Sequence, residues 1–457
     1  MVIFLLSAFS GALLSGAFEP IDKWWLAPLA IALHMHAINK SDRKFVSVAI
    51  FALFFNLFLL HWSSMYVGAL PWIILSIGLS LFYLPLVLVK RWGMASYPLI
   101  FIVLEEVRNR FPFNGFGWAR LAYSQPDAPY ALLARYGGAV GLSAITVIIA
   151  LVLYQISQQR LQILVLLPLM VLIIPVNVET TGHTQVLLIQ GNVPTLGLDF
   201  NSRATQVFLN HVEESKKALV RHPKVDFLLW PENAVDVDPF SNTQVKNLLD
   251  SFTTPLIVGA IVQRNAEVLN TSILWTKDAQ NIYSKQHLTP FGEYMPWRSL
   301  ARKISPFVDY LSDFTPGNTS KVFTIGKARI APIICFELLD DEIVQNAAKN
   351  ADIFAVQTNS ATFGKSAESA QQLAITRIRA IEHSRNVLSV STTGYSAVID
   401  YQGEILQKTK MGVAANIYAD VDLINELSPR DRYGDWSLVA TLLWLLLIAR
   451  RAYIHRR

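Results

Sequence analysis

Three ionisable residues, each at the end of an apolar run, could together carry nucleophilic chemistry. Glu232 lies in LLWPENA, Lys285 in NIYSKQHLTPFGEYMP and Cys335 in PIICFE. A thiolate is a strong nucleophile, a carboxylate can take its proton, and a lysine can stabilise the oxyanion of a tetrahedral intermediate. The combination predicts acyl transfer through a thioester. We expect the start of a following helix and a nearby cation to lower the pKa of the thiol.

Each of these residues also has an ordinary structural interpretation. A cysteine after an apolar run is more often an inert buried side chain than a nucleophile. Glu232 could begin the next helix, where a carboxylate suits the helix dipole, and Lys285 could be a solvated surface lysine. Chemistry is favoured only when the three are taken together, because their side chains complement one another. Their wide spacing means that the fold must bring them together.

All three residues fall in 178–435, the one region whose pattern is that of a globular domain. Apolar runs such as TQVLLIQGNV, PLIVGAIV and ADIFAVQTNS alternate there with helical stretches. This alternation predicts a sheet covered by helices, an α/β layered fold. Side chains that follow the strands of such a fold can converge at one edge of the sheet.

The rest of the chain is strongly apolar. Hydrophobic residues make up 52% of the 457 residues and charged residues only 16%, which is outside the range of an ordinary soluble protein. The pattern predicts an N-terminal membrane domain at 1–177 and a C-terminal transmembrane helix with a basic tail at 436–457. The first apolar segment lacks a basic start and is predicted to be a retained helix, not a signal peptide. The predicted crossings, eight with the C-terminal helix, lie near 1–17, 24–38, 45–65, 68–89, 95–106, 137–157, 161–177 and 436–454.

Basic loop residues give the expected orientation. The loops after the second, fourth and sixth crossings and the C-terminal tail carry lysines and arginines and fall on one side, which the positive-inside rule makes cytoplasmic. The globular region is then extracytoplasmic. Four arginines on the predicted outside argue against this, and we interpret their loop as structured: Arg108, Arg110, Arg120 and Arg135.

Several classes of function are disfavoured by composition. A single cysteine rules out an intramolecular disulfide and a cysteine-based metal centre, and the histidines form no HExxH pattern. We therefore expect no metal and no cofactor. The net charge of +5 is not gathered into a basic tract, so no nucleic acid is expected as a partner.

The segments WPENA, PFGEYMP and ICFE, in this order, resemble the Glu–Lys–Cys signature of the nitrilase (carbon–nitrogen hydrolase) superfamily. With seven apolar segments before them and one after, and with FPFNGFGWARLAYSQ and IQGNVP, the chain resembles the membrane-embedded apolipoprotein N-acyltransferase family over nearly its whole length. The resemblance implies an αββα sandwich in which Glu232 is the general base, Lys285 stabilises the oxyanion and Cys335 is the nucleophile.

The same resemblance implies further site residues. Glu293 and Glu337 would support the site, and Phe336 would occupy an aromatic position beside the cysteine. Two apolar arms, at 195–200 and 295–311, are candidates for dipping into the lipid. They and the residue before the second arm supply the possible substrate or lipid contacts: Phe200, Tyr294 and Trp297.

The implied reaction moves an acyl chain from a phospholipid, typically phosphatidylethanolamine, to Cys335 and then to the α-amine of a diacylglyceryl-cysteine at an apolipoprotein N-terminus. The implied place is the bacterial inner membrane, with the catalytic domain on the periplasmic side, and nothing demands more than a monomer. Two alternatives stay open: a membrane-tethered amidase or thioester hydrolase, and a non-catalytic homologue that binds lipids or lipoproteins.

The chain departs from the usual family pattern near the expected site. Ser360 and Thr362 stand where many members have an acid and an aromatic residue, and STTG, which contains Thr393, lacks a common asparagine. None of these positions belongs to the triad. The reaction class should therefore be unaffected, whereas donor or acceptor preference could change.

Overall fold

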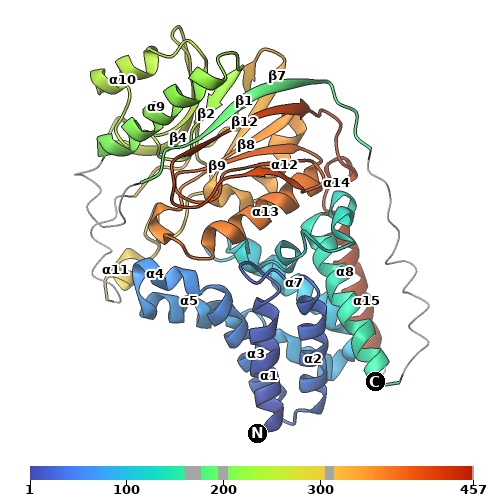
Figure 1. Cartoon of the computed structure of the whole chain (residues 1–457). Coiled ribbons are helices and arrows are strands. Elements are labelled where there is room, and N and C mark those ends of the chain that lie inside the picture. Colours follow the sequence, from blue (N-terminus) through green and yellow to red (C-terminus); the bar gives the residue numbers. More distant parts are fainter. Residues whose placement is uncertain (160–176, 194–203, 304–312, 455–457) are drawn as a thin grey trace. The chain divides into compact units, whose positions relative to one another are not determined.

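The computed structural model (Figure 1) describes residues 1–159, 177–193, 204–303 and 313–454. The chain forms two compact units, and each is described by itself below. One consists of Met1–Val176 with Ser428–Arg457, and the other of Asn177–Leu427.

The first unit is helical. Three of its helices, within the described residues, are long and apolar enough to cross a membrane: Ala69–Trp92, Ala131–Ser157 and Trp436–Ile454. They coincide with three of the eight predicted crossings. The crossing predicted at 161–177 lies, except for its last residue, outside the described residues, and the count of eight stays a prediction. The α-helices are α1 (Val2–Ser15), α2 (Leu26–Lys40), α3 (Lys44–Leu59), α4 (Ser64–Val67), α5 (Ala69–Leu81), α6 (Val89–Trp92), α7 (Tyr97–Arg110), α8 (Ala134–Ser157), α14 (Pro429–Tyr433) and α15 (Trp436–Ile454).

Charged side chains at the end of α7 face the interior of this unit. Glu105, Glu106 and Arg108 are almost fully buried, and the guanidinium of Arg120 pairs with Glu106. Arg135 is buried as well. Arg108, Arg120 and Arg135 thus lie in a structured part of this unit, whereas Arg110 is exposed and pairs with Glu106 at the helix end.

The second unit contains two six-stranded sheets. In the first, the order β12-β1-β2-β3-β4-β5 has parallel pairing from β1 to β3 and antiparallel pairing elsewhere. In the second, the order β11-β10-β9-β8-β7-β6 is parallel from β7 to β9. The strands are β1 (Gly182–Gln190), β2 (Phe227–Leu229), β3 (Leu256–Arg264), β4 (Glu267–Trp275), β5 (Gln280–Ser284), β6 (Phe323–Ile325), β7 (Ala328–Ile334), β8 (Ile353–Thr358), β9 (Asn386–Ser391), β10 (Ala397–Ile399), β11 (Ile405–Lys408) and β12 (Ala415–Leu423).

Strand β1 shows how the layers form. Val186 and Leu188 point into the core between the two sheets, whereas Leu187 and Ile189 point into the core under the outer helices. This is the two-residue alternation of a strand buried on both faces. The outer layers are visible in Figure 1: α9 (Ala204–Arg221) and α10 (Thr243–Asp250) on one side, and α12 (Asp341–Asn350) and α13 (Glu368–His383) on the other. The result is a helix–sheet–sheet–helix sandwich.

Candidate active site

The three residues singled out from the sequence all follow strands. Lys285 directly follows β5, Cys335 directly follows β7, and Glu232 lies three residues beyond the end of β2. The Lys285 Nζ lies 3.3 Å from Glu232 Oε1. Cys335 interacts electrostatically with both residues. The sandwich therefore brings together side chains that are 50 to 103 positions apart in the chain.

A hydrogen-bonded network surrounds Lys285, which is only 1% exposed. Its Nζ lies 2.7 Å from Glu293 Oε2, closer than to Glu232. The side-chain nitrogen of Asn270, on β4, donates to both carboxylates, at 2.8 Å to Glu232 and 2.6 Å to Glu293. Glu293 is held in turn by the backbone N–H of Thr289 at 2.7 Å. Glu232, the expected base, and Glu293, the supporting carboxylate, thus both contact Lys285 and Asn270.

Burial and the charges of this network shift the pKa values of Lys285, Glu232 and Glu293. Burial alone lowers the pKa of Lys285, but the carboxylates of Glu232 and Glu293 outweigh it, and the pKa lies above its ordinary value. Burial raises the pKa of Glu232, and the charge of Lys285 only partly offsets this. Burial acts in the same direction on Glu293, yet Lys285 holds its pKa below the usual range. Glu232 is thereby the more basic carboxylate, and Lys285 stays a cation.

Cys335 stands at a sharp turn. Its φ is 49°, in the left-handed region that non-glycine residues rarely adopt, and its thiol accepts a hydrogen bond from Gln372 Nε2 at 3.4 Å. Cys335 itself is partly exposed. The turn continues only as a five-residue 3-10 helix, Cys335–Leu339.

The expected direction of the thiol pKa is wrong. Burial, and then the negative charge of Glu232, raise the pKa of Cys335 well above its ordinary value, and Lys285 only partly opposes them. A single 3-10 turn offers little of the dipole that an α-helix would provide. The resting nucleophile is therefore a neutral thiol, and its proton must leave as the attack begins.

Glu337 joins the two loops that carry the nucleophile and the lysine. One oxygen accepts from the Tyr283 hydroxyl and from the backbone N–H of Gln286, both at 2.7 Å, and the other accepts from the backbone N–H of Ile334 at 2.7 Å. Tyr283 lies in β5 and Ile334 ends β7. Glu337 is placed to support the site by fixing the backbone of both loops.

Phe336, next to the nucleophile, is buried and packs edge to face against the His287 ring, with centroids 5.3 Å apart. His287 Nδ1 lies 2.9 Å from Asp340 Oδ2. Phe336 thus connects, by an apolar contact, the segment that follows Cys335 to the segment that follows Lys285.

Comparison with known proteins bears on this geometry. Residues 188–426 match the Carbon-nitrogen hydrolase family model, and residues 10–152 match the model of the Apolipoprotein N-acyltransferase N-terminal domain. The chain is 32% identical to the Apolipoprotein N-acyltransferase of Mycolicibacterium smegmatis over 92% of this chain and 80% of that protein. The chain belongs to the apolipoprotein N-acyltransferase family.

Other proteins are also similar to this chain. The Apolipoprotein N-acyltransferase of Azotobacter vinelandii is 28% identical over 98% of this chain and 95% of its own length. Among solved structures, Saccharomyces cerevisiae Nit3, a member of branch 10 of the nitrilase superfamily, matches at 18% identity and a TM-score of 0.40, covering 53% of this chain and 91% of that one. The helical unit with its apolar helices and the family membership together make this apolipoprotein N-acyltransferase family member a membrane protein.

The three candidate lipid contacts fare differently. Trp297 is 67% exposed and directly precedes the short helix α11 (Arg298–Ala301), so its ring can contact an apolar partner. Tyr294 is half-buried, and its carbonyl accepts from the backbone N–H of Phe291 at 2.8 Å. Phe200, the rest of the arm at 195–200, and residues 304–311 of the second arm lie outside the described residues.

Three site residues were not found by sequence reasoning: Asn270, Glu368 and Gln372. Asn270 could have been noticed as a polar residue within the apolar run VLNTSILW. Glu368 and Gln372 are four residues apart at the start of α13 and therefore lie on one face of that helix. Their spacing is a signal, but many exposed helices show the same spacing.

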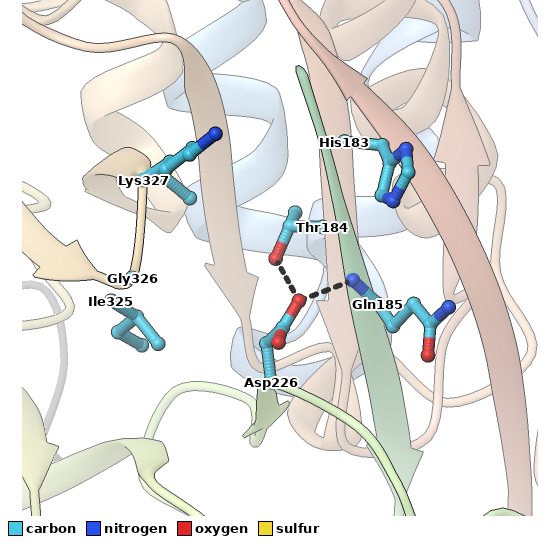
Figure 2. Close-up of a pocket in the computed structure, with 8 residues that line it drawn as sticks. His183, Thr184, Gln185, Asp226, Ile325, Gly326 and Lys327 are labelled. Atoms are coloured by element: carbon cyan, nitrogen blue, oxygen red, sulfur yellow. Dashed lines mark hydrogen bonds between the residues drawn. The ribbon is translucent and has the colours of Figure 1, made fainter.

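Figure 2 shows a separate hollow of about 350 Å³ near the start of β1 and the turn between β6 and β7. Its Asp226 carboxylate accepts from the Thr184 hydroxyl at 2.9 Å and from the backbone N–H of Gln185 at 2.8 Å. Thr184 and Gln185 lie near the N-terminal end of β1, which runs parallel to β2, whereas Glu232 follows the C-terminal end of β2. The hollow is therefore not part of the candidate site.

The described residues contain no group of three or more His, Cys, Asp or Glu side chains that could hold a metal ion.

Proposed function

We propose that Cys335, Glu232 and Lys285 carry out the acyl transfer of this protein in two steps. As a member of its family, the protein is an acyltransferase of lipoprotein maturation that uses phospholipid and apolipoprotein substrates. The observation that carries the residue assignment is the ion pair of Lys285 with Glu232 beside the only cysteine of the chain.

In the first step the Cys335 thiol gives its proton to Glu232, and the sulfur attacks an ester carbonyl of the phospholipid. Lys285 stabilises the oxyanion of the tetrahedral intermediate. The carbon–oxygen bond then breaks, and the lysophospholipid oxygen takes the proton back from Glu232. The raised pKa of Glu232 suits both transfers, because it makes the carboxylate a better base without preventing its return to the ionised state.

In the second step the α-amine of the diacylglyceryl-cysteine attacks the thioester carbon. A proton of the attacking nitrogen goes to Glu232, the carbon–sulfur bond breaks, and the proton returns to the Cys335 sulfur. Glu293 supports both steps because its ion pair keeps Lys285 charged and fixes the orientation of the lysine side chain. Glu337 and Phe336 support it by fixing the loops that carry the lysine and the cysteine.

We further propose phosphatidylethanolamine as the usual donor, and a monomer in the bacterial inner membrane as the working form. The catalytic domain, 178–435, would lie on the periplasmic side, between an N-terminal domain of about seven crossings and one C-terminal crossing. Basic loop residues support this orientation. The exposed Trp297 and the predicted arm at 195–200, with Phe200, would meet the lipid, with Tyr294 at the base of the second arm.

The deciding experiment uses the full-length protein in phospholipid vesicles. Mass spectrometry of the peptide containing Cys335 should show a gain of one acyl chain after incubation with phospholipid. Cys335→Ser should fold but give no thioester and no N-acylated lipoprotein. Unchanged N-acylation in that variant would overturn the assignment of the nucleophile.

A further inference from the structure

Helix α13 brings a second buried carboxyl group to the nucleophile. Glu368 is 3% exposed and lies one helical turn before Gln372, the residue whose side chain donates to the Cys335 sulfur. Glu368 interacts electrostatically with Cys335 and with Glu232. Its side chain is therefore directed toward the same side of the site as the thiol.

Glu368 is only partly satisfied by the described part of the chain. The hydroxyl of Ser360 donates a hydrogen bond to its carboxyl group, but the atom Oε2 is buried and has no hydrogen-bond partner among the described residues. A buried polar atom without a partner is costly, and such atoms are rare in folded proteins. Its presence beside a nucleophile points to a partner that arrives with the substrate.

The charge balance indicates the kind of partner. Lys285 is already shared by Glu232 and Glu293. No described cation acts on Glu368, and the charge that reaches it comes from Glu232, which is negative. A ligand group that both donates hydrogen bonds and carries positive charge would satisfy it, and a primary ammonium group has both properties.

We propose that Glu368 receives the α-ammonium group of the acceptor lipoprotein and takes the first of its protons. This inference rests on the proposed function. It would give the acceptor its own carboxylate, distinct from Glu232, which serves the thiol.

The proton account of the second step is then complete. The arriving R–NH₃⁺ transfers one proton to the Glu368 carboxylate, which leaves a neutral amine and a neutral acid. The amine nitrogen forms a bond to the thioester carbon, the carbon–sulfur bond breaks, and the second nitrogen proton goes to Glu232 and then to sulfur. Glu368 later returns its proton to water.

The environment of Glu368 suits this role. Burial, with a smaller contribution from Glu232, raises the pKa of Glu368 to about 8, although the Ser360 hydroxyl opposes the rise. An unperturbed α-amino group has a pKa near 7.7–8.0. With this pKa Glu368 is mainly protonated at neutral pH, and its ionised form, whose share grows as the pH rises through about 8, is the one that accepts the proton. A base whose pKa matches that of its acid accepts the proton at little cost in free energy.

The ethanolamine head group of a phospholipid also carries a primary ammonium. Position favours the acceptor, because the acceptor nitrogen must come within bonding distance of the carbon attached to the Cys335 sulfur. The head-group nitrogen is separated from the reacting ester by the glycerol backbone and the phosphate. An acid beside the sulfur is therefore placed for the acceptor.

The test measures the two half-reactions separately in the full-length protein. Thioester formation is followed by mass spectrometry with phosphatidylethanolamine or phosphatidylglycerol as donor. Transfer from the loaded enzyme is followed against the concentration of a synthetic diacylglyceryl-cysteine peptide. For Glu368→Gln we expect thioester formation within about threefold of the unchanged protein and a kcat/KM for the peptide lower by about 10- to 100-fold, the loss typical of a hydrogen bond to a charged group.

Two further variants make the result specific. Glu368→Asp keeps the charge and should recover part of the loss, mainly as a lower KM for the peptide. Glu342→Gln removes an exposed carboxylate from α12 and should change neither half-reaction.

Three outcomes would overturn the inference. In the first, Glu368→Gln leaves the kcat/KM for the peptide unchanged. In the second, it lowers the rate of thioester formation and the rate of transfer equally. In the third, it lowers only thioester formation from phosphatidylethanolamine, which would assign Glu368 to the head group. A failure of the proposed function would look different from these outcomes. The protein without any substitution would then form no thioester with either donor.

Discussion

Lys285 is the cation that neutralises the buried carboxylates of Glu232 and Glu293, so its removal should affect both. In Lys285→Gln the oxyanion loses its charged donor, and Glu232 and Glu293 lose the cation that lies 3.3 and 2.7 Å from them. We expect the rate of thioester formation to fall by about 10²- to 10³-fold, the usual effect of removing such a donor. Single-turnover mass spectrometry of the Cys335 peptide measures it. Lys246→Gln, which removes a half-exposed lysine from α10, is the matched control and should load normally.

Asp236, four residues beyond Glu232, makes stability depend on pH. Burial raises the pKa of Asp236 to about 7, and its Oδ1 is buried without a hydrogen-bond partner among the described residues. The folded state therefore binds more protons than the unfolded state between about pH 4 and pH 7, and stability falls as the pH rises through this window.

Asp236→Asn removes that dependence. We expect its melting temperature at pH 8 to exceed that of the unchanged protein by about 2–4 °C, the shift that about 1 kcal/mol produces in a domain of this size. The advantage should shrink toward pH 5. Asp278→Asn, at an exposed position between β4 and β5, should show no such trend. A constant difference at both pH values would contradict the prediction.

At the scale of elements, α13 holds the loop that carries the nucleophile. The Arg379 side chain donates to the backbone carbonyl of Leu338 at 2.7 Å and pairs with Asp341 at 2.6 Å and Glu382 at 2.5 Å. Arg379 itself is fully buried. One guanidinium thus connects α13 to the end of the 3-10 turn that begins at Cys335 and to the start of α12.

Arg379→Met should destabilise the catalytic unit by about 3–5 kcal/mol, because it leaves two carboxylates buried without their cation. Thermal unfolding measures the loss. Lys217→Met breaks a pair with Glu213 in which the two side chains are 55% and 67% exposed, and it should leave the stability nearly unchanged. Equal losses in the two variants would show that burial does not set the strength of the Arg379 pairs.

The strand ends were predictable because each apolar run stops at a change of composition. The apolar runs before Glu232 and Cys335 correspond to β2 and β7, whereas β5, before Lys285, is largely polar (QNIYS). The sequence could not give the direction of the thiol pKa. That direction depends first on the burial of the thiol and then on the charge of Glu232, and neither is visible in the spacing of residues along the chain.

Asn270 and Glu368 escaped prediction for a different reason. A polar residue in a strand and an acid in the first turn of a helix are both ordinary features of exposed surfaces. Only the packing of β4 and α13 makes these two buried, and burial is what gives them a role. The apolar helices pose a similar problem, because hydropathy alone does not decide whether a short apolar helix such as α1 crosses a bilayer.

For the whole molecule, orientation in the membrane can be tested with the cysteine count. The chain has one cysteine, so a Cys335→Ser background has none. In that background we expect the cysteine of Asp278→Cys to react with a membrane-impermeant maleimide that is added to cells with a permeabilised outer membrane. Lys40→Cys, at the exposed end of α2, should react only after the inner membrane is permeabilised. The opposite pattern would place the catalytic domain in the cytoplasm.

The backbone at Cys335 has a consequence for how this family can diverge. A non-glycine residue at φ 49° costs roughly 1–2 kcal/mol relative to glycine. Selection for folding alone would therefore favour glycine or asparagine at position 335, and only the need for a thiol opposes it. In a lineage that has stopped maturing lipoproteins, this position should drift early, so a glycine or asparagine there would identify descendants that kept the sandwich and gave up catalysis.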